Sequence, residues 1–276
     1  GFTFRLRFAK GSDRVRLTVE FEPVSESALL TGQFPRHFQA SIYAALDPAL
    51  AEHVHNVGFP IAKRALRMIV FSDVIFRERP LREPGGLRFR GPAAIVVASP
   101  VHAIIDSYAT SLLKTGAFRV GDELFRVTGV KADDSGVGEE HLEVRTLSPI
   151  VTYSTLLRPD GRKYTCYFQP GESDFRRLIA ENLARKYSAV YGREPERSVE
   201  VEVRRCGRMV IRDFKGTVVK GWHCKLALRG PKELLTLALD AGLGSKNAQG
   251  WGCVARVASG PDVTGRRASA RQLSAP

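Results

Sequence analysis

The stretch Asp240–Val254, DAGLGSKNAQGWGCV, is the part of the chain that says most about its fold. It contains four glycines, which are Gly242, Gly244, Gly250 and Gly252. Glycine has no Cβ, so it adopts positive φ readily and lets a second backbone approach closely. The polar residues between the glycines are Ser245, Lys246, Asn247 and Gln249. Polar side chains in such a loop can donate hydrogen bonds to phosphate groups or base edges, so the loop is a candidate nucleic-acid contact.

The elements around this loop exclude two well-known phosphate-binding loops. Apolar periodicity predicts a helix over Pro231–Ala241 and a strand over Trp251–Val257, so the loop leads from a helix into a strand. Walker loops and dinucleotide-binding loops run from strand to helix, because the phosphate meets the helix N-terminus. Gly242 also fits the position that ends a helix, so a cap followed by a bend is an alternative that explains about two of the glycines.

Outward from the loop, the chain shows one order of elements twice. In the second half, strands are predicted over 144–157 and 163–168, a helix over 172–191, and strands over 198–205, 209–214 and 217–228, before the last helix and strand. In the first half, strands are predicted over 2–9 and 14–22, a helix over 36–57 with a break at Asp47-Pro48, strands over 68–76 and 93–98, a helix to about 114, and a strand over 117–130. Ser99 is the expected N-cap of that second helix and Pro100 its first residue.

This order predicts an α+β protein with two tandem ferredoxin-like (βαββαβ) domains, because each half runs strand, helix, strand, strand, helix, strand. The expected domains are residues 1–132 and 141–258, joined by a polar loop over 131–140. Residues 259–276 are rich in Gly, Ser, Ala and Arg, and we expect them to form a disordered basic tail.

The composition favours a nucleic-acid partner. The chain has 42 Lys and Arg against 29 Asp and Glu, a formal net charge of +13. Such an excess is typical of proteins that bind a phosphate backbone, although some binders of acidic proteins or anionic lipid share it. The four cysteines form no CxxC pair, so no zinc site is predicted. With no signal peptide and no run of 18 apolar residues, we expect a cytoplasmic protein without a membrane span.

The sequence GLGSKNAQGWGCV resembles the glycine loop of the CRISPR repeat-processing endoribonucleases, which belong to the repeat-associated mysterious protein superfamily. Trp251 stands where Phe is more usual in that family. Other stretches that resemble the family occur in the same order along residues 2–257: FPRHFQASIYAAL from Phe34, HNVGF from His55, Phe71-Ser72, LSPIV from Leu147, and ENLARKY from Glu181.

The resemblance implies a metal-independent endoribonuclease that needs no cofactor. In such enzymes the 2′-OH beside the scissile phosphate attacks it, which gives a 2′,3′-cyclic phosphate and a 5′-OH. The chemistry needs a proton acceptor, a proton donor and a cation near the phosphate. Histidine suits the proton transfers because its pKa lies near neutrality.

Two histidines compete for the catalytic role. Asp47-Pro48 starts a new helical turn, and the apolar stripe that follows from it includes His53. His55 lies off this stripe, beside Gly58-Phe59, and matches the family's histidine, so it is the expected general acid or base. A metal site formed by both histidines is not expected, because residues i and i+2 of a helix do not share a face.

Tyr43 and Lys63 complete the expected catalytic set. Tyr43 matches the family's tyrosine and is the expected partner of His55 in proton transfer or ribose binding, with a half-buried aromatic as the alternative. Lys63 is the expected phosphate stabiliser, with Arg64 and Arg67 as competitors and a solvated basic loop as the alternative. The further candidate RNA-binding residues are Arg36, Arg64, Arg67, Arg204, Arg208, Arg212, Gly242, Gly244, Ser245, Lys246, Asn247, Gln249 and Gly250.

The basic residues of the strands Glu200–Arg204 and Met209–Phe214 are expected to share one exposed face, because side chains alternate along a strand. Arg185 and Lys186 are expected to be solvated. The implied partner is CRISPR repeat RNA, as a stem-loop or single strand, with an effector complex or a second copy of the chain as further partners. A repeat-binding subunit that does not cut RNA is one alternative function, and an enzyme that binds a phosphate ligand in the glycine loop is another.

Overall fold

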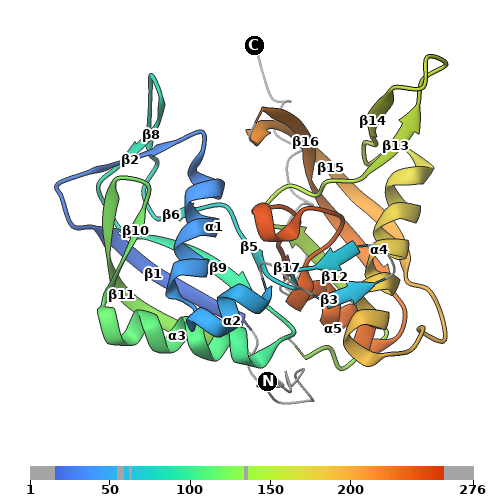
Figure 1. Ribbon diagram of the computed structural model, residues 1–276, viewed down its shortest axis with the longest axis horizontal. Helices are drawn as coiled ribbons and strands as arrows, with labels where there is room; N and C mark the ends of the chain where they lie inside the picture. Colours follow the sequence, from blue (N-terminus) through green and yellow to red (C-terminus); the bar gives the residue numbers. More distant parts are fainter. Residues whose placement is uncertain (1–15, 55–58, 62–63, 134–135, 215, 258–276) are drawn as a thin grey trace, which may run out of the picture.

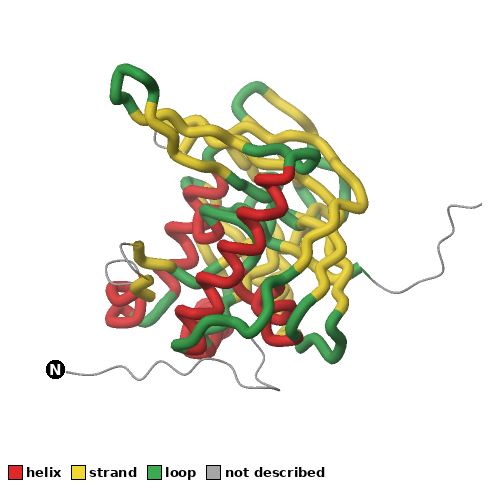
Figure 2. The backbone as a smooth tube through the Cα atoms, turned by 90° about the vertical axis from the view of Figure 1, so that its right-hand side faces the viewer, coloured by secondary structure: helices red, strands yellow, loops and turns green. Residues whose placement is uncertain are grey.

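A computed structural model describes residues 16–54, 59–61, 64–133, 136–214 and 216–257. The chain forms two βαββαβ units that lie side by side (Figure 1). Seen from the side, the long helices lie on one face of the molecule and most of the strands on the other (Figure 2). The fold is therefore α+β with two tandem ferredoxin-like domains, as the sequence predicts.

The first unit has the strand order of a ferredoxin-like sheet. Its elements are β1 (Arg16–Pro23), α1 (Phe34–Ala45), β5 (Val70–Phe71), β9 (Ala93–Ala98), α3 (His102–Thr115) and β11 (Glu123–Asp133). The strands lie in the order β11-β1-β9-β5, and every neighbouring pair is antiparallel. The inward side chains of β1 alternate along the strand. The ring centre of Phe21 lies 6.1 Å from that of Phe38 on α1.

The second unit repeats this plan. Its elements are β12 (His141–Thr146), α4 (Ser173–Tyr191), β15 (Glu200–Phe214), β16 (Thr217–Arg229), α5 (Lys232–Ala241) and β17 (Val254–Arg256). The strand order is β15-β16-β12-β17, again antiparallel. Phe175 and Ile179 of α4 and Leu234 of α5 are fully buried against the sheet.

Short elements extend both units. They are β2 (Ala28–Thr31), α2 (Pro48–Glu52), β3 (Phe59–Ile61), β4 (Arg64–Leu66), β6 (Ile75–Phe76), β7 (Leu81–Glu83), β8 (Gly86–Phe89), β10 (Ala117–Val120), β13 (Tyr153–Leu157), β14 (Lys163–Tyr167) and the 3-10 turn η2 (Asn247–Gln249). The predicted break at Asp47-Pro48 is confirmed, because Asp47 caps α2 by accepting hydrogen bonds from the backbone of Ala49 and Leu50. The predicted strands 117–130 and 144–157 are each divided in two.

The predicted single strand over 68–76 is also wrong, because the chain leaves the sheet between β5 and β6. Ser72 Oγ accepts a hydrogen bond from the Val96 backbone at 2.9 Å and donates to Asp73 O at 2.7 Å. The Asp73 backbone then donates to Leu147 O, in the second unit, at 3.1 Å. This connection turns Asp73 toward the other domain.

Three further differences concern element ends. Helix α3 starts at His102 with Val101 at its N-cap, because buried Ser99 forms a local turn in which its Oγ accepts from the Val101 backbone at 3.0 Å. The two predicted strands over 198–214 are one continuous strand, β15. Strand β17 begins three residues later than predicted, at Val254. The predicted strand over 2–9 and the predicted tail lie outside the described residues.

The core runs through both units. One cluster of buried apolar side chains includes Phe21 and Ile95 of the first unit and Leu226 and Leu234 of the second. Ser148 links them by hydrogen bonds: its Oγ donates to Phe71 O at 3.1 Å and accepts from the Cys253 backbone at 2.9 Å. The last residues of the glycine loop are therefore held directly against the first domain.

Candidate functional site

The glycine loop lies where the two domains meet, between α5 and β17 (Figure 1). Its η2 turn contacts α1 and β5 of the first domain. The four loop glycines all have positive φ: 72° at Gly242, 66° at Gly244, 82° at Gly250 and 74° at Gly252. A Cβ would meet protein atoms at each of them, so all four are required by the packing of the loop on the protein itself. A purely structural role, which the sequence indicates for about two of the glycines, therefore accounts for all four.

Gly252 and Gly250 are confined by different parts of the protein. A Cβ on Gly252 would lie 2.0 Å from Leu243 O, and one on Gly250 would lie 2.7 Å from the ring of Phe71. The first contact closes the loop on itself, and the second packs it on the first domain. The loop therefore keeps one shape only if both positions are glycine.

Lys186 of α4 holds this loop from inside. Its side chain is 3% exposed, and its Nζ donates to the carbonyl oxygens of Gly242 at 2.7 Å and Ala241 at 3.1 Å and to Asn247 Oδ1 at 2.7 Å. The Nδ2 of Asn247 in turn donates to Leu243 O at 3.1 Å and Trp251 O at 3.0 Å. Lys186 and Asn247 therefore form a polar network that fixes the loop backbone.

The expectation that Lys186 is solvated is wrong. Ile179, Leu183 and Val190 lie on the buried face of α4, and Lys186 falls seven, three and four residues from them. These are the spacings of one helix face, so the apolar stripe of the sequence contains the signal that Lys186 is buried. A lysine within such a stripe needs buried acceptors, and the glycine loop supplies them.

Burial shifts the pKa of Lys186, and we expect this shift to make the stability of the protein depend on pH. Loss of hydration lowers the pKa of Lys186 from 10.5 to about 7, and the charge of Arg185 adds to the shift. Between about pH 7 and pH 10 the unfolded chain keeps a proton that the folded chain has released. This group therefore makes the free energy of unfolding rise with pH, by at most about 1 kcal/mol per pH unit.

The Lys186→Met variant lacks this contribution. The difference in unfolding free energy between wild type and variant, measured by denaturant titration, should shift in favour of the wild type from pH 7 to pH 9. Lys114→Met, which removes an exposed lysine from α3, controls for net charge. A difference for Lys186→Met that does not change with pH would contradict this prediction.

A cavity of about 200 Å³ opens beside the glycine loop. Its charged and polar lining residues are Arg67, Tyr153, Asn182, Lys186, Ser245, Lys246, Asn247 and Gln249. Among the described residues, no carboxylate lines this cavity, so its described lining is positively charged. The structure thus brings together five of the predicted RNA-binding residues: Arg67, Ser245, Lys246, Asn247 and Gln249.

Tyr43 lies close to this cavity. It is a half-buried residue of α1, the helix that contacts η2. Burial raises the pKa of Tyr43, and the charge of Arg67 opposes the rise. The phenol is therefore protonated at neutral pH, so it can donate a hydrogen bond or a proton.

His55 and Lys63 lie outside the described residues. The short strands on either side of Lys63, β3 and β4, pair with each other, and β3 lies beside α4 (Figure 1). A segment of the first domain thus reaches across to the second. Arg64 is the first residue of β4. Arg36 lies exposed in the first turn of α1 and is not among the residues that line the cavity.

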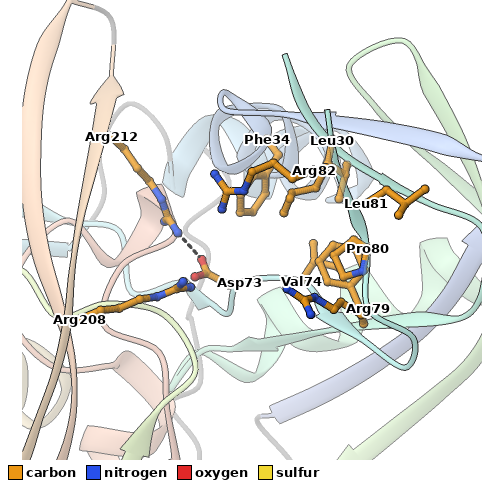
Figure 3. A pocket seen from close by; sticks show the side chains of 12 residues that line it. Leu30, Phe34, Asp73, Val74, Arg79, Pro80, Leu81, Arg82, Arg208 and Arg212 are labelled. Carbon is orange, nitrogen blue, oxygen red and sulfur yellow. Dashed lines mark hydrogen bonds and ion pairs between the residues drawn. The ribbon is translucent and has the colours of Figure 1, made fainter. Parts of the chain in front are cut away.

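A second, larger cleft of about 710 Å³ lies between the domains (Figure 3). Its basic lining residues are Arg79, Arg82, Arg208 and Arg212, and Asp73 is the one acidic residue of the described lining. Phe34, Phe76 and several leucines supply an apolar wall. A cleft that combines arginines with an aromatic wall fits single-stranded nucleic acid, because phosphates pair with guanidinium groups and bases stack on rings.

Arg212 joins three parts of the protein at the edge of this cleft. Its guanidinium donates to Asp73 Oδ1 at 2.7 Å (Figure 3). It also donates to Gly250 O at 3.3 Å and lies 4.6 Å from the ring centre of Trp251. His223 faces the same carboxylate, with its Nε2 3.9 Å from Asp73 Oδ2. Burial lowers the pKa of His223 although Asp73 opposes the shift, so the imidazole is neutral at pH 7.

The expectation that the arginines of β15 share one exposed face is wrong. Two register shifts occur in this strand, between Val203 and Arg205 and between Cys206 and Met209. The side chain of Arg212 is only 13% exposed and lies opposite fully buried Val219. Arg204 stays at the surface, 42% exposed, in an ion pair with Glu202.

Comparison with known proteins agrees with this architecture. Residues 132–255 match the family model described as CRISPR associated protein Cas6, C-terminal. The CRISPR-associated endoribonuclease Cas6 1 of Methanocaldococcus jannaschii is 29% identical over 216 residues, which cover 76% of this chain and 80% of that protein. The CRISPR-associated endoribonuclease Cas6 of Pyrococcus furiosus is 28% identical over 79% of this chain and 80% of its own length.

The chain is thus similar in sequence to CRISPR-associated Cas6 proteins. Solved structures of the family share its fold. A structure described as a Cas6-related gene product from Pyrococcus furiosus has a TM-score of 0.77 at 20% identity and covers 90% of this chain and all of that one. Another, titled CRISPR associated protein Cas6, has a TM-score of 0.73 at 24% identity and covers 88% and 99%.

Two other properties of the chain bear on its site. Among the described residues, no three His, Cys, Asp or Glu side chains gather closely enough to hold a metal ion. None of the helices in the described part of the chain combines the length and apolar character that a membrane span requires.

Proposed function

We propose that this chain is an endoribonuclease that binds CRISPR repeat RNA and cleaves precursor CRISPR RNA once within each repeat. The observation that carries the proposal is its similarity to two CRISPR-associated endoribonucleases over 80% of their lengths. The positively charged cavity beside the glycine loop supports it, because an RNA phosphate needs cationic partners.

The reaction we propose is an internal transfer that needs no metal. The 2′-oxygen loses its proton and bonds to the adjacent phosphorus, the bond from phosphorus to the 5′-oxygen breaks, and that oxygen takes up a proton. The products are a 2′,3′-cyclic phosphate and a 5′-OH. Protein side chains supply the two proton transfers and stabilise the charge on the phosphate.

His55, Tyr43 and Lys63 are the proposed catalytic residues. His55 would be the general acid or base, which its pKa near neutrality suits, and its support comes from the sequence pattern. Tyr43 stays protonated because its pKa is raised, so its proposed role is to donate to the leaving oxygen or to the ribose. Lys63 would stabilise the negative charge on the phosphate.

We assign two regions to RNA binding. The cavity beside the glycine loop would hold the nucleotides next to the cut, with Arg67 and Lys246 facing phosphates. The larger cleft would hold a single-stranded part of the repeat against Arg79, Arg82 and Arg208. The charge of Arg212 is already shared with Asp73, so its proposed role is to hold the glycine loop in place.

Cleavage assays in EDTA test the proposed function. The protein is incubated with a panel of end-labelled repeat RNAs, each beside a copy with a 2′-deoxy substitution at the mapped cut site. We expect one cut per repeat, a cyclic phosphate on the 5′ fragment detected by mass spectrometry, and no cut in the 2′-deoxy RNA. Cleavage that needs added Mg²⁺, or that persists in the 2′-deoxy RNA, would refute the mechanism.

A repeat-binding subunit that does not cut is the second candidate. It would use the same cavity and cleft to hold repeat RNA within an effector complex. Tight binding of a repeat RNA without cleavage under any of these conditions would favour it. Failure to bind any repeat RNA would refute both candidates.

A further inference from the structure

Two polar residues interrupt the buried face of α4, one helical turn apart. They are Asn182 and Lys186, and the other residues of that face are apolar or aromatic. The ammonium group of Lys186 is fully used by the glycine loop. The side chain of Asn182 is different: the residue is only 9% exposed, and no donor among the described residues reaches its Oδ1.

Gln249 presents a second acceptor of the same kind. It belongs to the η2 turn, on the loop that Lys186 holds, and its Oε1 is buried with no donor from the described part of the chain. Asn182 and Gln249 both line the 200 Å³ cavity. A buried acceptor without a donor destabilises the free protein, so two of them around one cavity indicate a ligand that supplies donors.

The rest of the cavity narrows the class of ligand. Arg67 and Lys246 supply positive charge, and Lys246 lies 5.5 Å from the ring centre of Tyr153. The ligand should therefore combine N–H donors with a negative charge and a flat surface, as a nucleotide does. The cavity is smaller than the roughly 300–1,000 Å³ of sites for drug-sized ligands, so it fits a single base and not a stack of bases.

We propose that this cavity receives one base of the bound RNA, and that Asn182 and Gln249 select a base with an exocyclic amine. Adenine, guanine and cytosine carry such an amine. Uracil has none: its single N3–H donor lies between two carbonyl oxygens, so at least one of the two amide oxygens would face another acceptor. This inference rests on the proposed function, since it names the nucleotide preference of the same site.

The competing explanation is that Asn182 only fills space. The Asn182→Leu variant separates the two, because leucine is similar in size and removes the unpaired oxygen. In the free protein this variant should unfold at the same or a higher denaturant concentration than the wild type. If Asn182 recognises a base, the same variant should nevertheless bind repeat RNA about 10-fold more weakly.

The test measures dissociation constants with a repeat RNA made resistant to cleavage by a 2′-deoxy group at the cut site. Each single-stranded adenosine, guanosine and cytidine is replaced in turn by an analogue without its exocyclic amine, such as purine riboside or inosine. We expect one position at which removal of the amine weakens binding to the wild type about 10-fold. At that position, removal of the amine should not change the affinity of Asn182→Leu. Gln249→Met, a near match in shape, should remove the sensitivity at the same position.

Two outcomes would overturn the inference in distinguishable ways. The unmodified repeat RNA could bind tightly while no removal of a base amine has an effect that Asn182→Leu or Gln249→Met abolishes. Base selection in this cavity would then be refuted, and the proposed function would stand. If no repeat RNA binds the wild type, the proposed function fails and the inference fails with it.

Discussion

Replacing His55 with alanine should slow cleavage of a repeat RNA by about 100- to 10,000-fold, the usual contribution of a positioned general acid or base. The dissociation constant for uncleavable RNA should stay within about threefold, because many other basic side chains remain to bind the phosphates. Single-turnover rates with enzyme in excess measure the cleavage step itself, so a change in product release would not obscure the effect.

His53 provides the matched control for this prediction. It lies two residues away, at the C-terminal end of α2, where it is half-buried. His53→Ala should leave the single-turnover rate within about threefold of the wild type. A large loss for His53→Ala together with a normal rate for His55→Ala would reverse the assignment of the two histidines.

The second large effect is on stability: Gly252→Ala should lower the free energy of unfolding by an amount at the upper end of about 2–5 kcal/mol. The residue has a φ of 74°, which costs an L-amino acid about 1–2 kcal/mol. The new Cβ would also lie 2.0 Å from Leu243 O and 2.7 Å from Asn247 Nδ2, so the loop backbone has to move. Such overpacking costs about 1–3 kcal/mol more.

Gly116→Ala separates the cost of positive φ from the cost of overpacking. Gly116 has a similar φ of 65°, at the C-terminal end of α3, but a Cβ there would meet no atom within 4 Å. Its substitution should therefore cost only the backbone term of about 1–2 kcal/mol. Equal losses for the two variants, measured by chemical denaturation, would show that the glycine loop accommodates a methyl group freely.

The sequence predicted the fold well because strand and helix patterns are local. The alternation in β1 and the capped break at Asp47-Pro48 each depend on a few neighbouring residues, and both are present. The glycine loop was likewise recognisable, since glycine, lysine and asparagine at those spacings are a local pattern. Its contacts were not, because they come from Phe71, Val151 and Lys186, far away in the sequence.

The errors have a common physical origin in contacts between distant segments. Arg212 of β15 is partly buried because Asp73, Gly250 and Trp251 surround it, and these partners lie far away in the sequence. Asp73 is drawn out of the first sheet by a hydrogen bond to the second domain. Asn182 is not among the residues predicted from the sequence, although a polar residue four positions before a buried lysine on an apolar stripe is a signal that helix periodicity contains.

The hydrogen bonds of Ser148 have a consequence for how the molecule comes apart. This one hydroxyl joins Phe71 of the first domain to Cys253 after the glycine loop, and the apolar core continues across the same boundary. Neither half could separate without exposing apolar surface and leaving these partners unpaired. The chain should therefore melt in a single cooperative transition, although its topology is that of two domains.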